Sequence, residues 1–269
     1  MIDSLENPTD TEVAAAAALA GAEVVRARYG RLHSRIDNGS GDFATDAGLA
    51  AEEAILGVIR AARPGDAVHG EEGGRRGAVG AEREWLVDPL CGTLNYVVGS
   101  QLVAVYVALR NGPAAVTDPF SGEVFLTDGE TARVRRGTSG DERRLAPTAD
   151  TRLVDVNLDP PFPGAPGFRA VDLLAHPGFV ENFRPRVVST SLAPAWVAAG
   201  RRAAYVTDGD LSGSVHFAAG IALCRAAGCV VTGVDGRPVG RGGRGLVVAP
   251  DARTHELLMS MIGGPPGSD

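Results

Sequence analysis

The chain has 269 residues, which is long enough to bury a sizeable core in one large domain or in two closely joined halves. Apolar residues make up 44% of it and charged residues 22%, as is typical of globular proteins and not of disordered chains. The formal net charge of −7 argues against nucleic acid or an anionic membrane as the main partner, because such binders usually carry a basic excess.

The residue types exclude several chemistries. All 26 basic residues are arginines, so Schiff-base chemistry on lysine and a phosphate-binding loop with a lysine are both excluded. The chain has three cysteines, Cys91, Cys224 and Cys229, and no two of them form a C-x-x-C pair. An odd number of cysteines without that spacing predicts neither a disulfide framework nor a cysteine-only zinc site. The composition therefore predicts a cytoplasmic protein. The Ala-rich run 13–22 is too short to cross a bilayer and is predicted to be helical.

Hydrophobic periodicity predicts an N-terminal half of helices followed by a meander of mixed or antiparallel strands. Two helices are expected first, at 10–29 and 49–62, separated by a polar loop at 38–42. The strands are expected at 67–69, 84–87, 101–110, 114–118, 123–128 and 131–135.

The segment 159–167 is rich in proline and glycine and marks the best boundary between two halves. We therefore predict an N-terminal α+β half, residues 1–158, and a C-terminal α/β half, residues 159–269. In the second half we expect helices at 193–199 and 215–227 and strands at 203–207, 230–234 and 246–249.

Three segments place polar or reactive residues at the ends of apolar runs: 69–72, 85–99 and 214–220. In the middle segment, a strand that ends in Asp88-Pro89 is followed by Gly92-Thr93, where a helix is expected to start. The free N–H groups of that helix start would point at a bound ligand.

This middle segment resembles the motif W-x-x-D-P-[LI]-D-G-T-x-N-[FY]-x-x-G of the inositol monophosphatase family, which comprises metal-dependent phosphatases. The matching residues are Trp85, Asp88, Pro89, Leu90, Gly92, Thr93, Asn95, Tyr96 and Gly99. Glu71-Glu72 is similar to the G-E-E element of the family, and 215–220 is similar to W-D-x-A-A-G. The resemblance covers nearly the whole chain and implies an α/β (α+β) fold with the layered αβαβα arrangement of that family.

The departures from the family pattern affect the metal ligands. The resemblance implies that two aspartates should bind a second magnesium ion, but Cys91 and His216 occupy their positions. A third carboxylate, the last of D-x-V-T-x-x-D, is replaced by Gly48. Thiolate and imidazole are poor substitutes for the oxygen ligands of Mg²⁺. The resemblance further implies that Cys91 and His216 lie close together with Asp88 beside them.

A Cys/His/Asp set has a direct chemical interpretation. Cys91 would act as a thiolate nucleophile, with His216 taking its proton and Asp88 orienting the imidazole. The dipole of the following helix would favour the thiolate. The N–H groups of Gly92 and Thr93 would bind an oxyanion, and Glu71 is expected beside the substrate.

This set on this scaffold resembles the Dieckmann cyclases that release tetramate and pyridone products. It predicts a cyclase acting on a β-ketoacyl aminoacyl thioester, with a carrier protein as partner, no metal and no cofactor. The main alternative is a Mg²⁺-dependent phosphatase of inositol or sugar phosphates, in which Glu71, Asp88 and the Leu90 carbonyl hold one ion. Two further alternatives are a zinc site at Asp88, Cys91 and His216, and a non-catalytic protein that binds a partner. The oligomeric state, monomer or homodimer, is left open.

Overall fold

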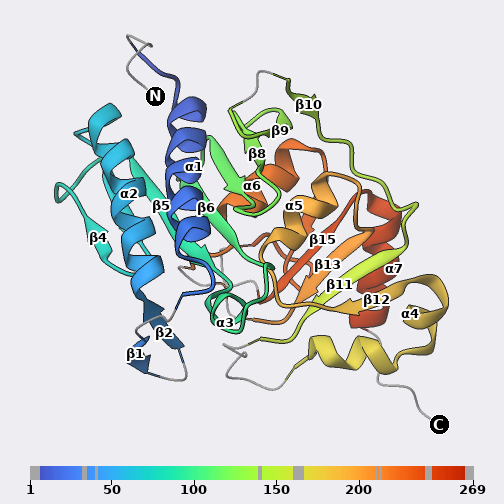
Figure 1. The fold of residues 1–269 in the computed structure, drawn as a ribbon. Coiled ribbons are helices and arrows are strands. Elements are labelled where there is room, and N and C mark those ends of the chain that lie inside the picture. The colour runs from blue at the N-terminus through green and yellow to red at the C-terminus, as the bar shows by residue number, and fades with distance from the viewer. Residues whose placement is uncertain are drawn as a thin grey trace. The chain divides into compact units, whose positions relative to one another are not determined.

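The computed structural model describes residues 7–31, 35–39, 42–138, 141–159, 167–209, 211, 214–239 and 244–263, and in them the chain forms two compact units (Figure 1). The first unit is built from the chain up to Arg144, together with Thr190–Leu192 and Val215–Leu223. The second unit comprises the remaining segments. These two units differ in two ways from the predicted halves, residues 1–158 and residues 159–269. The chain leaves the first unit at Leu145, and the segment that carries His216 returns to it.

In its described residues, the first unit contains an eight-stranded sheet, a two-stranded hairpin and three helices that lie wholly within it. Its elements are α1 (Asp10–Arg28), β1 (Arg35–Gly39), β2 (Asp42–Thr45), α2 (Asp46–Ala62), β3 (Ala67–Gly70), β4 (Gly74–Arg76), β5 (Glu84–Cys91), α3 (Thr93–Val97), β6 (Ala104–Leu109), β7 (Ala114–Thr117), β8 (Glu123–Thr127), β9 (Ala132–Arg136) and β10 (Arg143–Arg144). The predicted loop 38–42 overlaps the hairpin of β1 and β2, and Ser40 and Gly41 in it lie outside the described residues.

The strand order of the large sheet is β10-β9-β8-β7-β6-β5-β3-β4. From β5 to β10, each strand pairs antiparallel with the next, which confirms the predicted meander. By contrast, β3 pairs parallel with β5, so the carboxyl ends of these two strands lie at the same edge of the sheet. Both outermost strands, β10 and β4, are short and carry arginines.

Helices α1 and α2 lie side by side against this sheet (Figure 1). Thr9 begins α1 with a capping box: its side chain accepts from the backbone of Glu12, and the Glu12 carboxylate accepts from the backbone of Thr9. Thr45 caps α2 by accepting a hydrogen bond from the backbone N–H of Gly48. The structure therefore confirms both predicted helices, and α2 begins three residues earlier than expected.

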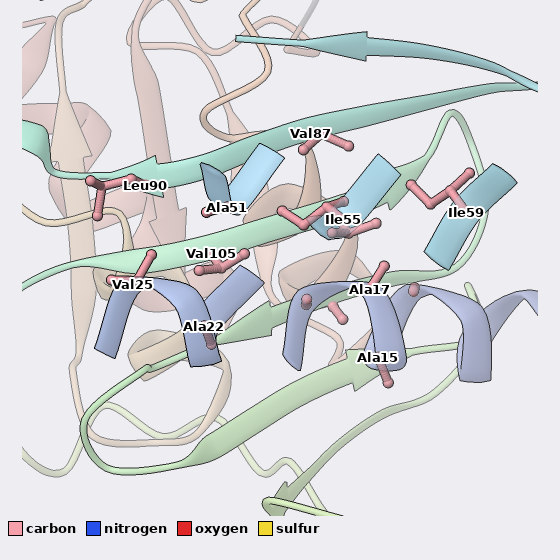
Figure 2. Packing of buried hydrophobic residues seen from close by; sticks show 14 of the residues in the cluster. Ala15, Ala17, Ala22, Val25, Ala51, Ile55, Ile59, Val87, Leu90 and Val105 are labelled. Carbon is pink, nitrogen blue, oxygen red and sulfur yellow. The ribbon is translucent and has the colours of Figure 1, made fainter. Parts of the chain in front are cut away.

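Small residues allow the two helices to approach closely. Figure 2 shows alanines of α1, Ile55 and Ile59 of α2, Val87 of β5 and Val105 of β6 packed in one buried cluster. A Cβ atom on Gly21 would lie 2.8 Å from Ile55 Cδ1, so this glycine has no room for a larger side chain. Burial of this apolar surface is the main source of stability for the first unit.

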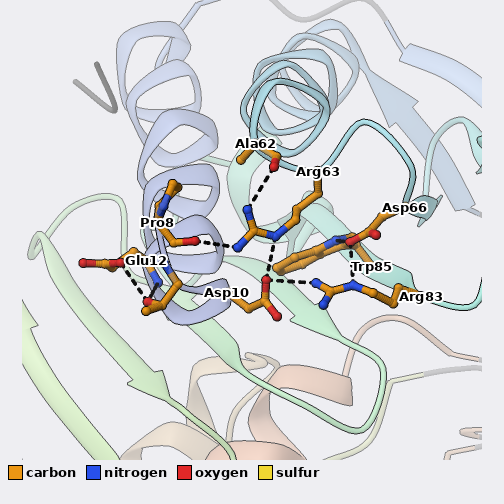
Figure 3. A network of polar contacts seen from close by, with 9 residues as sticks. Pro8, Asp10, Glu12, Ala62, Arg63, Asp66, Arg83 and Trp85 are labelled. Carbon is orange, nitrogen blue, oxygen red and sulfur yellow. Dashed lines mark hydrogen bonds and ion pairs between the residues drawn. The ribbon is translucent and has the colours of Figure 1, made fainter. Parts of the chain in front are cut away.

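A polar network joins the starts of α1 and β5 to the end of α2 (Figure 3). Asp10 accepts from Arg63 Nε at 2.8 Å and pairs with Arg83 Nη2 at 2.9 Å. Asp66 accepts from Arg83 Nε at 3.1 Å and from the indole N–H of Trp85 at 2.8 Å. The amino end of β5 is thereby fixed, while its other end carries the candidate site.

The second unit contains a five-stranded sheet in the order β12-β11-β13-β15-β14. Its elements are β11 (Leu153–Asn157), η1 (Ala170–Ala175), α4 (Pro177–Asn182), β12 (Arg184–Val187), β13 (Ala204–Thr207), β14 (Val230–Thr232), β15 (Leu246–Ala249) and α7 (Ala252–Ile262). Two further helices, α5 (Leu192–Ala198) and α6 (Ala218–Ala226), each contain residues of both units. Because β11 pairs with β12 and β13, residues 153–157 belong here and not to the N-terminal half.

The described residues form a mixed α/β structure of helices and sheets, which is the predicted fold class. None of the helices among these residues combines the length and the apolar character needed to cross a membrane.

The buried face of α2 offers a test of this packing. Leu56 is 1% exposed, whereas Leu94 in α3 is 58% exposed. We expect Leu56→Ala to lower the free energy of unfolding by about 2–5 kcal/mol, since it removes packed atoms and leaves a cavity. The matched change Leu94→Ala should cost no more than about 0.5 kcal/mol. Urea unfolding followed by circular dichroism measures both, and equal losses would contradict the packing described.

Candidate functional site

The candidate site is built on the carboxyl end of β5. The register with β6 shifts between Asp88 and Cys91, where Pro89 has no N–H to donate to the ladder. Asp88 Oδ1 accepts a hydrogen bond from the Leu90 backbone N–H at 3.2 Å, which holds the carboxylate in place. The local sequence therefore bends the strand and fixes the orientation of Asp88.

Gly92 ends the strand and permits the turn into α3. Its φ of +101° is a left-handed conformation that a residue with a side chain rarely adopts. A Cβ atom there would also lie 2.9 Å from the Leu102 carbonyl oxygen. Next to it, the Thr93 hydroxyl donates to the Leu90 carbonyl at 3.1 Å. The predicted helix start at Gly92-Thr93 is thus present, although α3 has only five residues.

Glu71 reaches the same edge of the sheet from β3. Its backbone N–H donates to the Val87 carbonyl at 3.0 Å, so the chain leaves β3 directly beside β5. Parallel pairing of β3 with β5 brings Glu71 and Asp88 together from different parts of the sequence. This edge therefore carries two carboxylates.

His216 comes from the turn before α6, in the segment that belongs to the first unit. Its Nδ1 lies 2.7 Å from Asp88 Oδ2 and 3.7 Å from Glu71 Oε1. The ring is partly exposed, whereas Asp88 is fully buried. A hydrogen bond between His216 and Asp88 thus links two segments separated by 128 residues.

Cys91 completes the group. One ligand atom from each of Asp88, Cys91 and His216 lies within 4.8 Å of the others. The structure therefore brings together the three residues singled out from the sequence. Glu71 lies beside His216, and Gly92 and Thr93 follow Cys91 directly along the chain. The catalytic and oxyanion-binding roles assigned to these residues stay predictions.

Burial and charge affect the acid groups differently. Burial acts to raise the pKa of Asp88, but the hydrogen bond and charge of His216, with hydrogen bonds to Glu71 and Cys91, hold that pKa below its ordinary value. Burial raises the pKa of the Cys91 thiol well above its ordinary value, and the charges of Asp88 and Glu71 raise it further. This arrangement favours a carboxylate at Asp88 and a protonated thiol at Cys91, in place of the predicted thiolate.

A supporting carboxylate was missed by the sequence analysis. Glu52 lies on the buried face of α2, only 2% exposed, and accepts a hydrogen bond from the Glu72 backbone N–H at 2.9 Å. Burial raises its pKa, although Arg76 and backbone hydrogen bonds act against this. A glutamate in line with Ile55 and Ile59 on an apolar stripe was the signal that could have identified it. Glu52 positions the loop that carries Glu71.

Gly48, which replaces a carboxylate of the family pattern, leaves space that another carboxylate occupies. A Cβ atom on Gly48 would lie 2.4 Å from Glu72 Oε1. An aspartate at position 48 is therefore incompatible with this placement of Glu72.

Known proteins with similar sequences and folds define the class of this chain. The profile of the inositol monophosphatase family matches residues 6–263, and the chain belongs to this family. It is 30% identical over 249 residues to the probable inositol 1-monophosphatase ImpA of Mycobacterium tuberculosis, covering 87% of this chain and 86% of that protein. It is 33% identical over 236 residues to the Nus factor SuhB of Pseudomonas aeruginosa, covering 82% and 83%.

Solved structures support the same fold. The extragenic suppressor protein suhB from Bartonella henselae superposes with a TM-score of 0.79 at 24% identity, over 94% of this chain and 98% of that one. The inositol monophosphatase TM1415 of Thermotoga maritima superposes with a TM-score of 0.73 at 19% identity, over 91% and 93%. These likenesses confirm the predicted layered fold of the inositol monophosphatase type.

The prediction of a Dieckmann cyclase is wrong. The matching family is the inositol monophosphatase family, and the similar ImpA is named as a probable inositol 1-monophosphatase, which favours the phosphatase alternative over a thioester-cleaving enzyme of antibiotic biosynthesis. The physical reason for the error is that the prediction rested on the identities of Cys91 and His216 alone. It did not include the negative charges of Asp88 and Glu71, which act on the thiol. The thiol lies beside two carboxylates that oppose its ionisation. The carrier-protein partner was inferred from that activity alone and stays a prediction.

The turn at Gly92 gives a test of the site's construction. We expect Gly92→Ala to lower the free energy of unfolding by about 1–3 kcal/mol more than Gly129→Ala does. Gly129 has a similar φ of +99° but nothing within 4 Å of an added Cβ, so it controls for backbone strain alone. Urea unfolding of both variants measures the difference. Equal losses would show that the Leu102 carbonyl does not restrict this position.

Proposed function

We propose that this protein is a phosphomonoesterase that hydrolyses a phosphate ester of inositol or of a sugar. The observation that carries the proposal is the pair of carboxylates, Glu71 and Asp88, retained at the sheet edge of a chain that belongs to the inositol monophosphatase family. The names of similar proteins, such as the inositol 1-monophosphatase ImpA, support the same substrate class.

The family implies magnesium, and the donors at this edge fit one such ion. Glu71 and Asp88 both approach the same nitrogen of His216, so their carboxylates lie close together in partly buried surroundings. Two adjacent carboxylates are best stabilised by a cation between them. Glu71, Asp88 and the Leu90 carbonyl would hold it, all oxygen ligands of the kind Mg²⁺ prefers. A bound divalent cation polarises phosphoryl oxygens and makes a coordinated water more acidic.

The remaining residues of the site would orient the ester. The backbone N–H groups of Gly92 and Thr93 begin α3 and would donate to phosphate oxygens. The Thr93 hydroxyl donates to the Leu90 carbonyl, which fixes that carbonyl in position. His216 holds Asp88 through its Nδ1 hydrogen bond. These contacts would position a phosphate beside the carboxylate pair.

The proposal is tested by phosphate release. Purified protein is incubated with inositol monophosphate or a sugar phosphate, with Mg²⁺ or with EDTA. We expect Mg²⁺-stimulated, EDTA-sensitive release of inorganic phosphate. Absence of release from all such esters, or release that is insensitive to EDTA, would contradict the proposal.

A substitution of Glu71 tests the site directly. We expect Glu71→Gln to lower kcat/KM by at least about tenfold, because one of the two cation-binding charges is lost. Glu82→Gln removes an equal charge from an exposed position and should leave the rate unchanged. Circular dichroism checks that both variants fold. A variant Glu71→Gln with the wild-type rate would place the reaction elsewhere.

A further inference from the structure

The side chains at the second magnesium position of the family do not fit magnesium. Asp88 offers an oxygen, Cys91 a sulfur and His216 a nitrogen, all within 4.8 Å of one another. Mg²⁺ requires a near-octahedral shell of oxygens and binds sulfur and imidazole poorly. Two of the three donors are therefore of the wrong kind, and the family's second magnesium site is not retained in this chain.

The same donors match a different class of cation. Zn²⁺ binds thiolate sulfur at about 2.3 Å and imidazole nitrogen or carboxylate oxygen at about 2.0–2.2 Å, in a tetrahedral arrangement. Three protein ligands with a fourth position open to water is the common form of a reactive zinc site. In the part of the chain that the structure describes, no other group of three such side chains meets the same distance limit.

The positions of the three side chains allow them to close on an ion. In a tetrahedral site the ligand atoms lie between about 3 and 4 Å apart. His216 Nδ1 and Asp88 Oδ2 are 2.7 Å apart and would move slightly apart, while the Cys91 sulfur already lies within 4.8 Å of the other two donors. Asp88 is held by the Leu90 N–H, and Cys91 lies at the shifted end of β5, so both are fixed. The His216 side chain is 39% exposed and lies in a turn, so the adjustment falls on this ring and not on the buried end of β5.

The surroundings supply the outer contacts that such sites need. Asp88 accepts from the Leu90 N–H through Oδ1 and faces His216 with Oδ2. The Glu71 carboxylate lies 3.7 Å from His216 Nδ1, so a further negative charge lies close to the three donors. A negative charge at this distance favours a cation bound between them.

We propose that Asp88, Cys91 and His216 form a binding site for Zn²⁺ in place of the second magnesium site of the family. Asp88 has two carboxylate oxygens, so this site can exist beside a cation at Glu71. The proposal concerns binding and does not depend on the hydrolysis proposed above.

The test is metal binding to the metal-free full-length protein. Zn²⁺ and Mg²⁺ are titrated by calorimetry, and Co²⁺ is used as a spectroscopic substitute for Zn²⁺. We expect one tight Zn²⁺ per chain, and a sulfur-to-cobalt charge-transfer band with Co²⁺. Cys91→Ser should abolish the band. Both Cys91→Ser and His216→Ala should weaken Zn²⁺ binding by more than the roughly 10- to 100-fold loss that follows removal of an outer contact.

Matched controls keep the result specific. Cys229→Ser changes another buried cysteine, and His255→Ala changes a histidine that contacts Thr232, so neither should alter Zn²⁺ binding. The double change Cys91→Asp with His216→Asp restores oxygen donors and should shift preference from Zn²⁺ toward Mg²⁺. Circular dichroism confirms that each variant folds, and the cobalt spectrum of the wild-type protein needs no variant.

Three outcomes would overturn the proposal: no stoichiometric Zn²⁺ binding, a cobalt complex without the sulfur band, or Zn²⁺ affinity unaffected by Cys91→Ser and His216→Ala. Zinc binding without phosphate release would overturn the proposed function alone. Phosphate release without zinc binding would overturn this inference alone.

Discussion

The site depends on one buried charge, the carboxylate of Asp88. It is fully buried at the bent end of β5, where water cannot stabilise it, so neighbouring groups must do so. The Leu90 N–H and the His216 ring both hydrogen-bond to it, and Cys91 and Glu71 lie around it. The chain around the site is arranged to hold this carboxylate in one orientation. Any chemistry assigned to the site must therefore involve Asp88, because the other side chains of the site are arranged around its carboxylate.

Much of the first unit could be predicted from sequence, because its physical signals are local. The alternation of apolar residues identified the strands of the meander, and the Ala-rich run 13–22 identified α1. The second helix was recognised from its composition and the turn residues that follow it, although its start at Thr45 was missed. The motif around Asp88 predicted the strand end and the following helix start. The second unit was harder. Its strand β11 was missed although a turn precedes it, and α7 was missed although Asp251 caps it by accepting from the Thr254 N–H.

The site illustrates a different limit. The sequence showed that Cys91 and His216 replace two ligands, and the structure places them together with Asp88. Whether a buried cysteine is a nucleophile, a metal ligand or a protonated neighbour depends on the charges that surround it in space. Those charges come from Glu71, 20 positions away in sequence, and from the depth of Asp88 in the sheet. Residue identity alone could not supply this information, which is why the cyclase prediction failed.

Three of the four outermost strands of the two larger sheets, β10, β4 and β12, are built so that another chain pairs with them poorly. In the larger sheet they are β10 and β4, of two and three residues, with two arginines each. In the smaller sheet, β12 reads Arg-Pro-Arg-Val. A short strand with bulky positive charges, or with a proline that cannot donate, is a poor template for another chain. In a protein without lysine, arginine supplies the positive charge that disfavours edge-to-edge pairing at these three strands.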